Sequence, residues 1–248
     1  METRNGLAAA LAALVLFSTS ATAQRFYIGA SGGASRVDSG FSEQASNAFA
    51  SYMNGILAVS DIRTDAAGGA GRLLAGIRLS DTFALEADYT RLGDIIATYT
   101  TRDSAPRNPE LNQSFTTTRI ESELEALGIA LVAHARILDR MTVFGRAGVA
   151  RTRFDQENTG CLYFANNASQ PFRQVSCGNN SNLVVNETRP VAGLGVDWRV
   201  AERFAVRASW DRYFGVGKAF TIEPPGPRNE AKGEFDIDYF GIGASSSF

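Results

Sequence analysis

The sequence has no apolar run of membrane-helix length, and it is poor in histidine, cysteine and lysine. The missing run excludes a helical membrane span, because a helix needs about 20 consecutive apolar residues to cross a bilayer. The 24 basic and 26 acidic residues leave a net charge of −2, which provides no strong field for a polyanion. We therefore expect no nucleic-acid partner.

The scarcity of histidine and cysteine also limits the chemistry that is available. A Ser-His-acid site requires a histidine beside a serine and a carboxylate, and His134 is the only histidine. Neither Cys161 nor Cys177 has a histidine or a second cysteine at metal-ligand spacing. We therefore expect no catalytic residues, no cofactor and no metal site.

The first residues have the plan of a secretory signal peptide. Arg4 precedes an apolar run at 7–17, and the small residues 21–23 precede Gln24. This pattern predicts a signal peptide at 1–23 and a single exported domain at 24–248. Because export leads to an oxidising compartment, Cys161 and Cys177 are expected to form a disulfide.

Alternation with a period of two runs through the exported part and is clearest at its end. One face of the last segment carries Phe240, Ile242, Ala244 and the terminal Phe248, and the other carries glycine and serine. A strand of an outer-membrane barrel needs this pattern, because one face meets lipid and the other meets the lumen.

The same alternation predicts eight strands that are joined alternately by short turns and long polar segments. The short turns are 80–82, 138–140 and 201–203. The long segments follow residue 37, span 91–119, contain the two cysteines, and span 215–234. This plan predicts an all-β fold, an eight-stranded antiparallel up-and-down transmembrane β-barrel in the bacterial outer membrane, with four long extracellular loops.

Several pieces of the chain resemble the OmpA-like, or opacity-type, outer-membrane β-barrel family. They are residues 26–30, 75–86, 144–149 and 193–198, together with the terminal Phe248. The resemblance implies a bare barrel, since no peptidoglycan-binding domain follows the last strand. An outer-membrane barrel is expected to contact outer-membrane lipids, and its C-terminal strand, through Phe240, Ile242 and Phe248, is expected to be recognised by the barrel-assembly machinery. Arginines near the outer ends of strands, Arg91, Arg119, Arg151 and Arg153, either meet the phosphates of lipopolysaccharide or are ordinary solvated loop charge.

Successive side chains of a strand face opposite sides of the sheet, so the odd or even position of a residue in its strand, its parity, predicts whether it faces the lumen or the lipid. The face that carries arginine is expected to be lumenal, because arginine on the lipid face near the midplane costs about 2–4 kcal/mol. The predicted lumenal set is Arg72, Arg78, Glu86, Asp88, His134, Arg136, Arg146, Asp197, Arg199, Arg207 and Asp211. Such a set either plugs a narrow barrel or forms ion pairs that exchange partners and gate a pore.

Three functions follow from this reading. The first is a non-enzymatic outer-membrane barrel that contributes to envelope structure or to surface interaction through its loops. The second is a porin-like channel for small solutes, gated by lumenal ion pairs. The third, with the weakest basis, is an enzyme that modifies lipid A at the outer rim.

Overall fold

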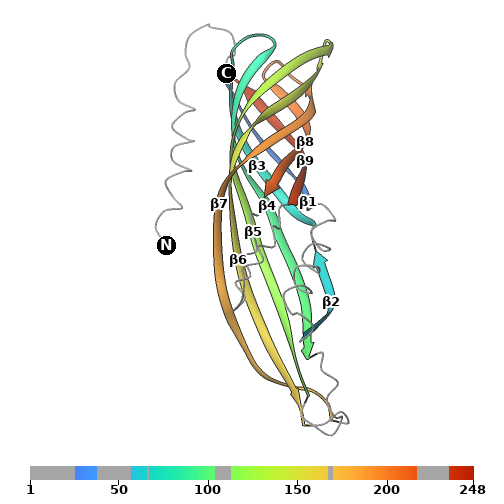
Figure 1. Ribbon diagram of the computed structural model, residues 1–248. Coiled ribbons are helices and arrows are strands. Elements are labelled where there is room, and N and C mark those ends of the chain that lie inside the picture. The colour runs from blue at the N-terminus through green and yellow to red at the C-terminus, as the bar shows by residue number, and fades with distance from the viewer. Residues whose placement is uncertain (1–25, 38–56, 66, 104–112, 167–169, 217–234) are drawn as a thin grey trace.

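The computed structural model describes residues 26–37, 57–65, 67–103, 113–166, 170–216 and 235–248. These residues form nine strands of one antiparallel sheet (Figure 1): β1 (Phe26–Val37), β2 (Leu57–Asp65), β3 (Ala67–Arg78), β4 (Phe83–Asp103), β5 (Gln113–Leu138), β6 (Met141–Ala165), β7 (Arg173–Arg199), β8 (Phe204–Val216) and β9 (Phe235–Ser247). No helix in these ranges is long and apolar enough to span a bilayer. The signal peptide predicted at 1–23 lies outside the described residues.

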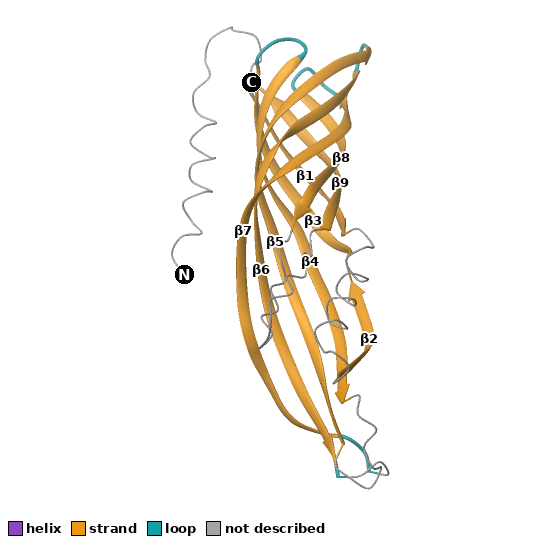
Figure 2. Cartoon of the chain, viewed as in Figure 1, coloured by secondary structure: helices purple, strands orange, loops and turns teal. Residues whose placement is uncertain are grey.

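All strands except β2 close into a ring, so the predicted eight-stranded antiparallel barrel is confirmed. Each strand of the ring pairs with its neighbour, and β1 pairs with β9 from Tyr27↔Ser247 to Val37↔Ile237. The amide of Phe248 completes this seam by donating to the carbonyl oxygen of Phe26 at 2.9 Å. The C-terminus and the three short turns lie at one end of the barrel (Figure 2); we call this the turn end.

The outer surface of the ring is apolar, as a lipid-facing surface requires. Its exposed side chains come from alternate positions and include Leu73, Leu85, Leu127, Ile129, Leu131, Val149, Leu194, Val206, Phe240 and Ile242. At the turn end the exposed large hydrophobic residues include five aromatic ones: Phe26, Phe83, Trp198, Phe204 and Phe248. Aromatic residues at the edge of an apolar band mark a membrane interface.

The described parts of two segments predicted as long loops are strands instead. The 91–119 segment contains the end of β4 and the start of β5, and the cysteine segment contains the end of β6 and the start of β7. Residue pairing continues to Arg102↔Phe115 between β4 and β5, and to Gln113↔Ala165 between β5 and β6. The prediction of loops was wrong because these residues do not contact lipid. Their strands therefore need no apolar face, and the sequence shows no apolar alternation there.

A fifth strand joins this extension, which we call the projecting sheet (β2 with 94–103, 113–125, 153–165 and 173–188). β2, which falls in the first predicted long loop, pairs with β4 from Leu57↔Asp103 to Asp65↔Ile96. The sheet extends away from the turn end as a curved blade (Figure 1). Long regular strands therefore make up much of the described protein beyond the barrel, and the fourth predicted long segment, at 215–234, lies almost wholly outside the described residues.

Gly93 marks the point where β4 leaves the barrel. The register between β4 and β5 shifts between Arg91 and Asp94, and Gly93 has a φ of 80°, which favours glycine because other residues clash there. A bulge of this kind bends a strand. Before it β4 pairs with β3, and after it β4 pairs with β2.

Candidate functional site

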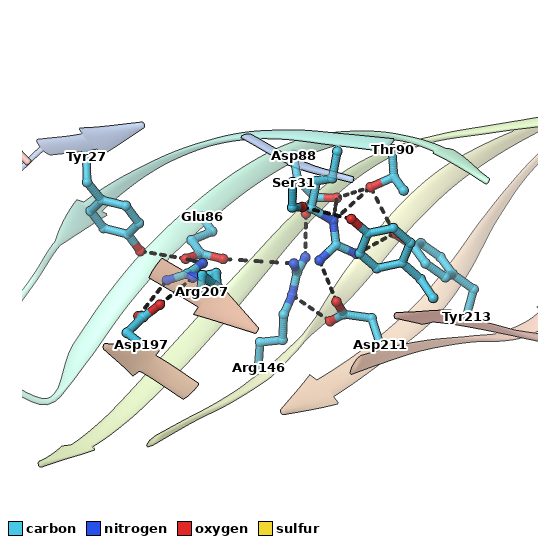
Figure 3. A network of polar contacts seen from close by, with 12 residues as sticks. Tyr27, Ser31, Glu86, Asp88, Thr90, Arg146, Asp197, Arg207, Asp211 and Tyr213 are labelled. Carbon is cyan, nitrogen blue, oxygen red and sulfur yellow. Dashed lines mark hydrogen bonds and ion pairs between the residues drawn. The ribbon is translucent and has the colours of Figure 1, made fainter. Parts of the chain in front are cut away.

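The barrel lumen holds a buried network of charged side chains (Figure 3). Arg146 lies at its centre: its guanidinium pairs with Asp88, with Asp211 at 3.3 Å and with Glu86 at 3.9 Å. Glu86 and Asp211 are fully buried. Because each charge is shielded from water, its energy depends on these partners.

Arg207 carries the network toward the turn end. It donates to Glu86 at 2.6 Å and makes two hydrogen bonds with Asp197, at 2.8 and 3.0 Å. The hydroxyl of Tyr27 donates to Glu86 at 2.8 Å. The guanidinium also lies 4.4 Å from the ring centre of Phe144, so apolar groups pack against it as well.

Arg72 carries the network toward the opposite end. It pairs with Asp211, donates to Thr90 at 3.0 Å and donates to the hydroxyl of Tyr213 at 3.1 Å. The guanidinium lies 4.3 Å from the centre of the Tyr239 ring. Thr90 in turn donates to Asp88 at 3.0 Å, so this end is held by hydroxyl groups as well as by charges.

Apolar side chains pack beyond both ends of the network. Toward the projecting sheet is a buried cluster drawn from most strands of the ring: Val37, Leu92, Leu124, Ala126, Ala150, Phe154, Val191, Tyr213, Val216, Phe235, Ile237 and Tyr239. Toward the turn end is a smaller cluster of Tyr27, Leu74, Ala84, Val132 and Phe144. The lumen is therefore layered, with charges between two apolar layers.

The remaining residues of the predicted lumenal set do not join this network. Arg78, Arg136 and Arg199 are exposed at the turn end, and His134 is partly buried there. Strand parity does not say how far along the axis a residue lies, and these four lie at the ends of their strands. His134 has the ring of Phe144 beside it, with the centres 6.0 Å apart.

Sequence analysis missed the neutral members of the network. Tyr27, Thr90 and Tyr213 hydrogen-bond to its charged groups, and the hydroxyls of Ser31 and Tyr239 lie 2.8 Å apart. The signal was available for Thr90 and Tyr213, because each has the same parity as the lumenal charged residues of its strand. It was absent for Tyr27, Ser31 and Tyr239, because the charged residues of β1 and β9 lie at the opposite parity. A search restricted to charged residue types overlooks these neutral residues.

Charged side chains cover the outer face where the barrel passes into the projecting sheet. Arg91 lies 3.4 Å from Asp94 and 3.5 Å from Glu123, and Arg153 lies 3.3 Å from Asp155. Arg91, Glu125 and Arg153 occupy one row across β4, β5 and β6. We call these residues the charged belt, and it marks where the apolar outer face ends.

The tip of the projecting sheet carries aromatic rings beside a disulfide. Cys161 and Cys177 are bonded across β6 and β7, which confirms the predicted disulfide. Phe115 stacks on Tyr163 with ring centres 4.7 Å apart and meets Phe172 edge-on at 4.8 Å. Phe172 is 40% exposed, so this tip cluster reaches solvent.

The architecture agrees with a comparison against protein families. Residues 9–248 match the model of the outer membrane protein beta-barrel domain. The chain belongs to this outer-membrane β-barrel family. The resemblance noted in the sequence is thereby confirmed, and so is the location in the bacterial outer membrane.

Solved structures with similar folds include members from other bacteria. Neisserial surface protein A is 12% identical with a TM-score of 0.46, over 90% of this chain and 97% of that one. The N-terminal β-barrel domain of Pseudomonas aeruginosa OprF is 13% identical with a TM-score of 0.43, over 91% and 98%. Ail of Yersinia pestis is 11% identical with a TM-score of 0.39, over 90% and 98%. No curated protein matches the sequence significantly.

Membership of the family indicates which end of the barrel faces the periplasm and which faces the outside of the cell. Bacterial outer-membrane barrels place short turns in the periplasm and long connections outside the cell. The turn end is therefore periplasmic, and the projecting sheet with its tip cluster is extracellular.

Proposed function

We propose that this outer-membrane barrel is a non-enzymatic surface-contact protein whose projecting sheet binds a molecule or surface outside the cell. One observation carries the proposal: β5 has 26 residues and β7 has 27, whereas a tilted strand crosses a bilayer in about 9–11. From the charged belt at Glu125 to Gln113, β5 extends about 40 Å at the rise of a strand. Spanning the membrane does not need that length.

The tip cluster is the part of the sheet best suited to contact. Aromatic rings supply much of the contact area in protein interfaces, and Phe115, Tyr163 and Phe172 are held together by ring stacking. The disulfide between Cys161 and Cys177 fixes β6 to β7 beside them. Fixing the rings before contact reduces the entropy lost on binding.

The charged belt, together with Arg151 beside it, suits contact with lipopolysaccharide, which we include in the proposal. Arg151 is exposed in the same row as the outward-facing Leu127, at the boundary of the apolar surface. Arginine matches phosphate groups through its forked donors. Contact of Phe240, Ile242 and Phe248 with the assembly machinery likewise remains a proposal.

The two alternatives have less support. A solute channel must cross the apolar layer around Phe154 and Phe235, where the residues of the cluster are buried. A lipid A enzyme needs its catalytic groups at the outer rim, whereas His134 lies at the periplasmic end.

The test is a truncation that keeps strand register. Residues 97–120 and 157–182 are deleted and replaced by short turns, since Ile96 pairs with Glu121 and Gln156 with Leu183. Full and truncated proteins in nanodiscs are screened against arrays of polysaccharides, lipopolysaccharides and extracellular-matrix proteins. We expect at least one interaction of the full protein to be lost on truncation.

Two controls accompany this screen. Heat-dependent gel migration shows that the truncated barrel is folded. Phe115→Ser with Phe172→Ser tests the tip alone, and Val184→Ser, an exposed substitution on the shaft of the sheet, is its matched control. A truncated protein that retains every interaction of the full chain contradicts the proposal.

A further inference from the structure

The periplasmic mouth of the barrel contains a small basic pocket that the surface-contact function does not use. Its cavity has a volume of about 60 Å³ and is lined by five arginines against two carboxylates, Asp197 and Glu202. A cavity needs roughly 10–15 Å³ of such volume to hold one water molecule, so this one has room for a small polar group.

The arginines of the pocket are of two kinds. Arg207 at its floor is buried and is already paired with Glu86 and Asp197. The other four are exposed around the rim: Arg78, Arg140, Arg199 and Arg203. Within the described part of the chain none of these four makes an ion pair. Their guanidinium groups are therefore available to an incoming anion.

Backbone hydrogen bonds hold this rim in place. The amide of Arg199 donates to the carbonyl oxygen of Arg140 at 2.8 Å. The amide of Ser247 donates to the carbonyl oxygen of Arg203 at 2.9 Å. The turns that carry the arginines are thus tied to neighbouring strands. Like charges held together repel one another, and an anion that bridges them relieves this repulsion.

The donors around the pocket are those that recognise a phosphate group. Guanidinium groups bind phosphate through two parallel hydrogen bonds, and the hydroxyls of Thr142 and Ser247 also line the cavity. We propose that the periplasmic mouth binds a phosphate group, presented by a phospholipid of the periplasmic leaflet or by a soluble phosphate compound.

The position of the pocket favours a lipid headgroup as the source. Phe204 lines the cavity and is also 55% exposed. Phe26, Phe83 and Trp198 are exposed at the same end, and such aromatic residues mark the level of the headgroups. The pocket therefore lies at the level of the lipid headgroups, where phosphates are concentrated.

The test titrates inorganic phosphate into the exported protein in maltoside micelles, which contain no phosphate. Arginine Nε–Hε resonances are followed by NMR, with sodium chloride at equal ionic strength as the reference. We expect saturable shifts, and an affinity about tenfold weaker in the Arg199→Gln/Arg203→Gln variant, because charge-assisted hydrogen bonds are lost. Arg78→Gln/Arg140→Gln provides a second variant on the other part of the rim.

The matched control is Arg119→Gln/Arg173→Gln, which removes two exposed arginines on the extracellular side and is expected to bind as the unchanged protein does. Absence of saturable shifts, or equal weakening in the control, overturns the proposal. A repeat in phosphatidylglycerol nanodiscs separates the sources: shifts that vanish identify the headgroup as the occupant, and shifts that persist identify a soluble phosphate compound.

Discussion

Gly193 on β7 lies directly opposite Asp211 on β8, and a Cβ atom at position 193 would lie 2.0 Å from the Asp211 carboxylate. The same arrangement joins Gly128 and Asp88, where that separation would be 2.9 Å. The lumenal glycines at these positions make room for the carboxylates of the network. A larger side chain therefore disturbs buried charges as well as packing.

Gly193→Ala should lower the free energy of unfolding by about 1–3 kcal/mol, the usual cost of overpacking. Gly145→Ala is the control, since its nearest neighbour would be 4.0 Å away. Urea unfolding in detergent, followed by tryptophan fluorescence, measures both. Equal stability of the two variants would show that position 193 is not crowded.

Arg146→Met should be strongly destabilising, by about 3–5 kcal/mol, because it leaves buried carboxylates without a partner. The control Arg153→Met removes an exposed pair with Asp155 and should cost no more than about 1 kcal/mol. The same unfolding measurement compares them. A small effect of Arg146→Met would mean that the lumen is more hydrated than its buried side chains indicate.

The folded protein should be electrically silent in a planar bilayer, since apolar layers lie on both sides of the charged network. Single-channel recording of the refolded exported chain checks this, with heat-dependent gel migration as the folding control. Discrete openings that change in Glu86→Gln, but not in the exposed control Glu123→Gln, would instead favour the gated channel.

Loss of the disulfide should loosen the tip and leave the barrel intact. Cys161 and Cys177 are separated by 16 residues, and closing such a loop is worth about 3 kcal/mol on the chain-entropy model. In Cys161→Ser/Cys177→Ser, amide exchange should accelerate in the paired ends of β6 and β7 while heat-dependent migration is unchanged. Uniform acceleration throughout the barrel would contradict this separation.

The barrel was predictable because lipid imposes a simple rule on every strand that crosses it. Leu127, Ile129 and Leu131 are exposed on one face of β5 while Ala130 and Val132 are buried on the other, and the sequence shows that period directly. Beyond the membrane the rule no longer applies. Thr117 and Arg119 of β5 face out with no apolar requirement, so the pattern predicts a loop for residues that form a strand.

The lumenal site was partly predictable for a related reason. Parity identified Arg72, Glu86 and Asp211 as inward-facing, because charge is costly on the lipid face. It does not give height along the axis, which separates the buried Arg146 from the exposed Arg199. The basic pocket depends on Arg140 and Arg203 in the turns, and their convergence follows from closure of the ring, which is a tertiary property.

The pairing of β1 with β9 has a consequence for the order of assembly. The seam from Tyr27↔Ser247 to Val37↔Ile237 joins the two ends of the described chain, so the ring cannot close until its last strand is available. Contacts of such sequence separation form slowly. A chain interrupted before β9 would leave β1 and β8 as unpaired edges, and such edges pair with other chains. Closure of the barrel therefore depends as a whole on the thirteen residues of β9.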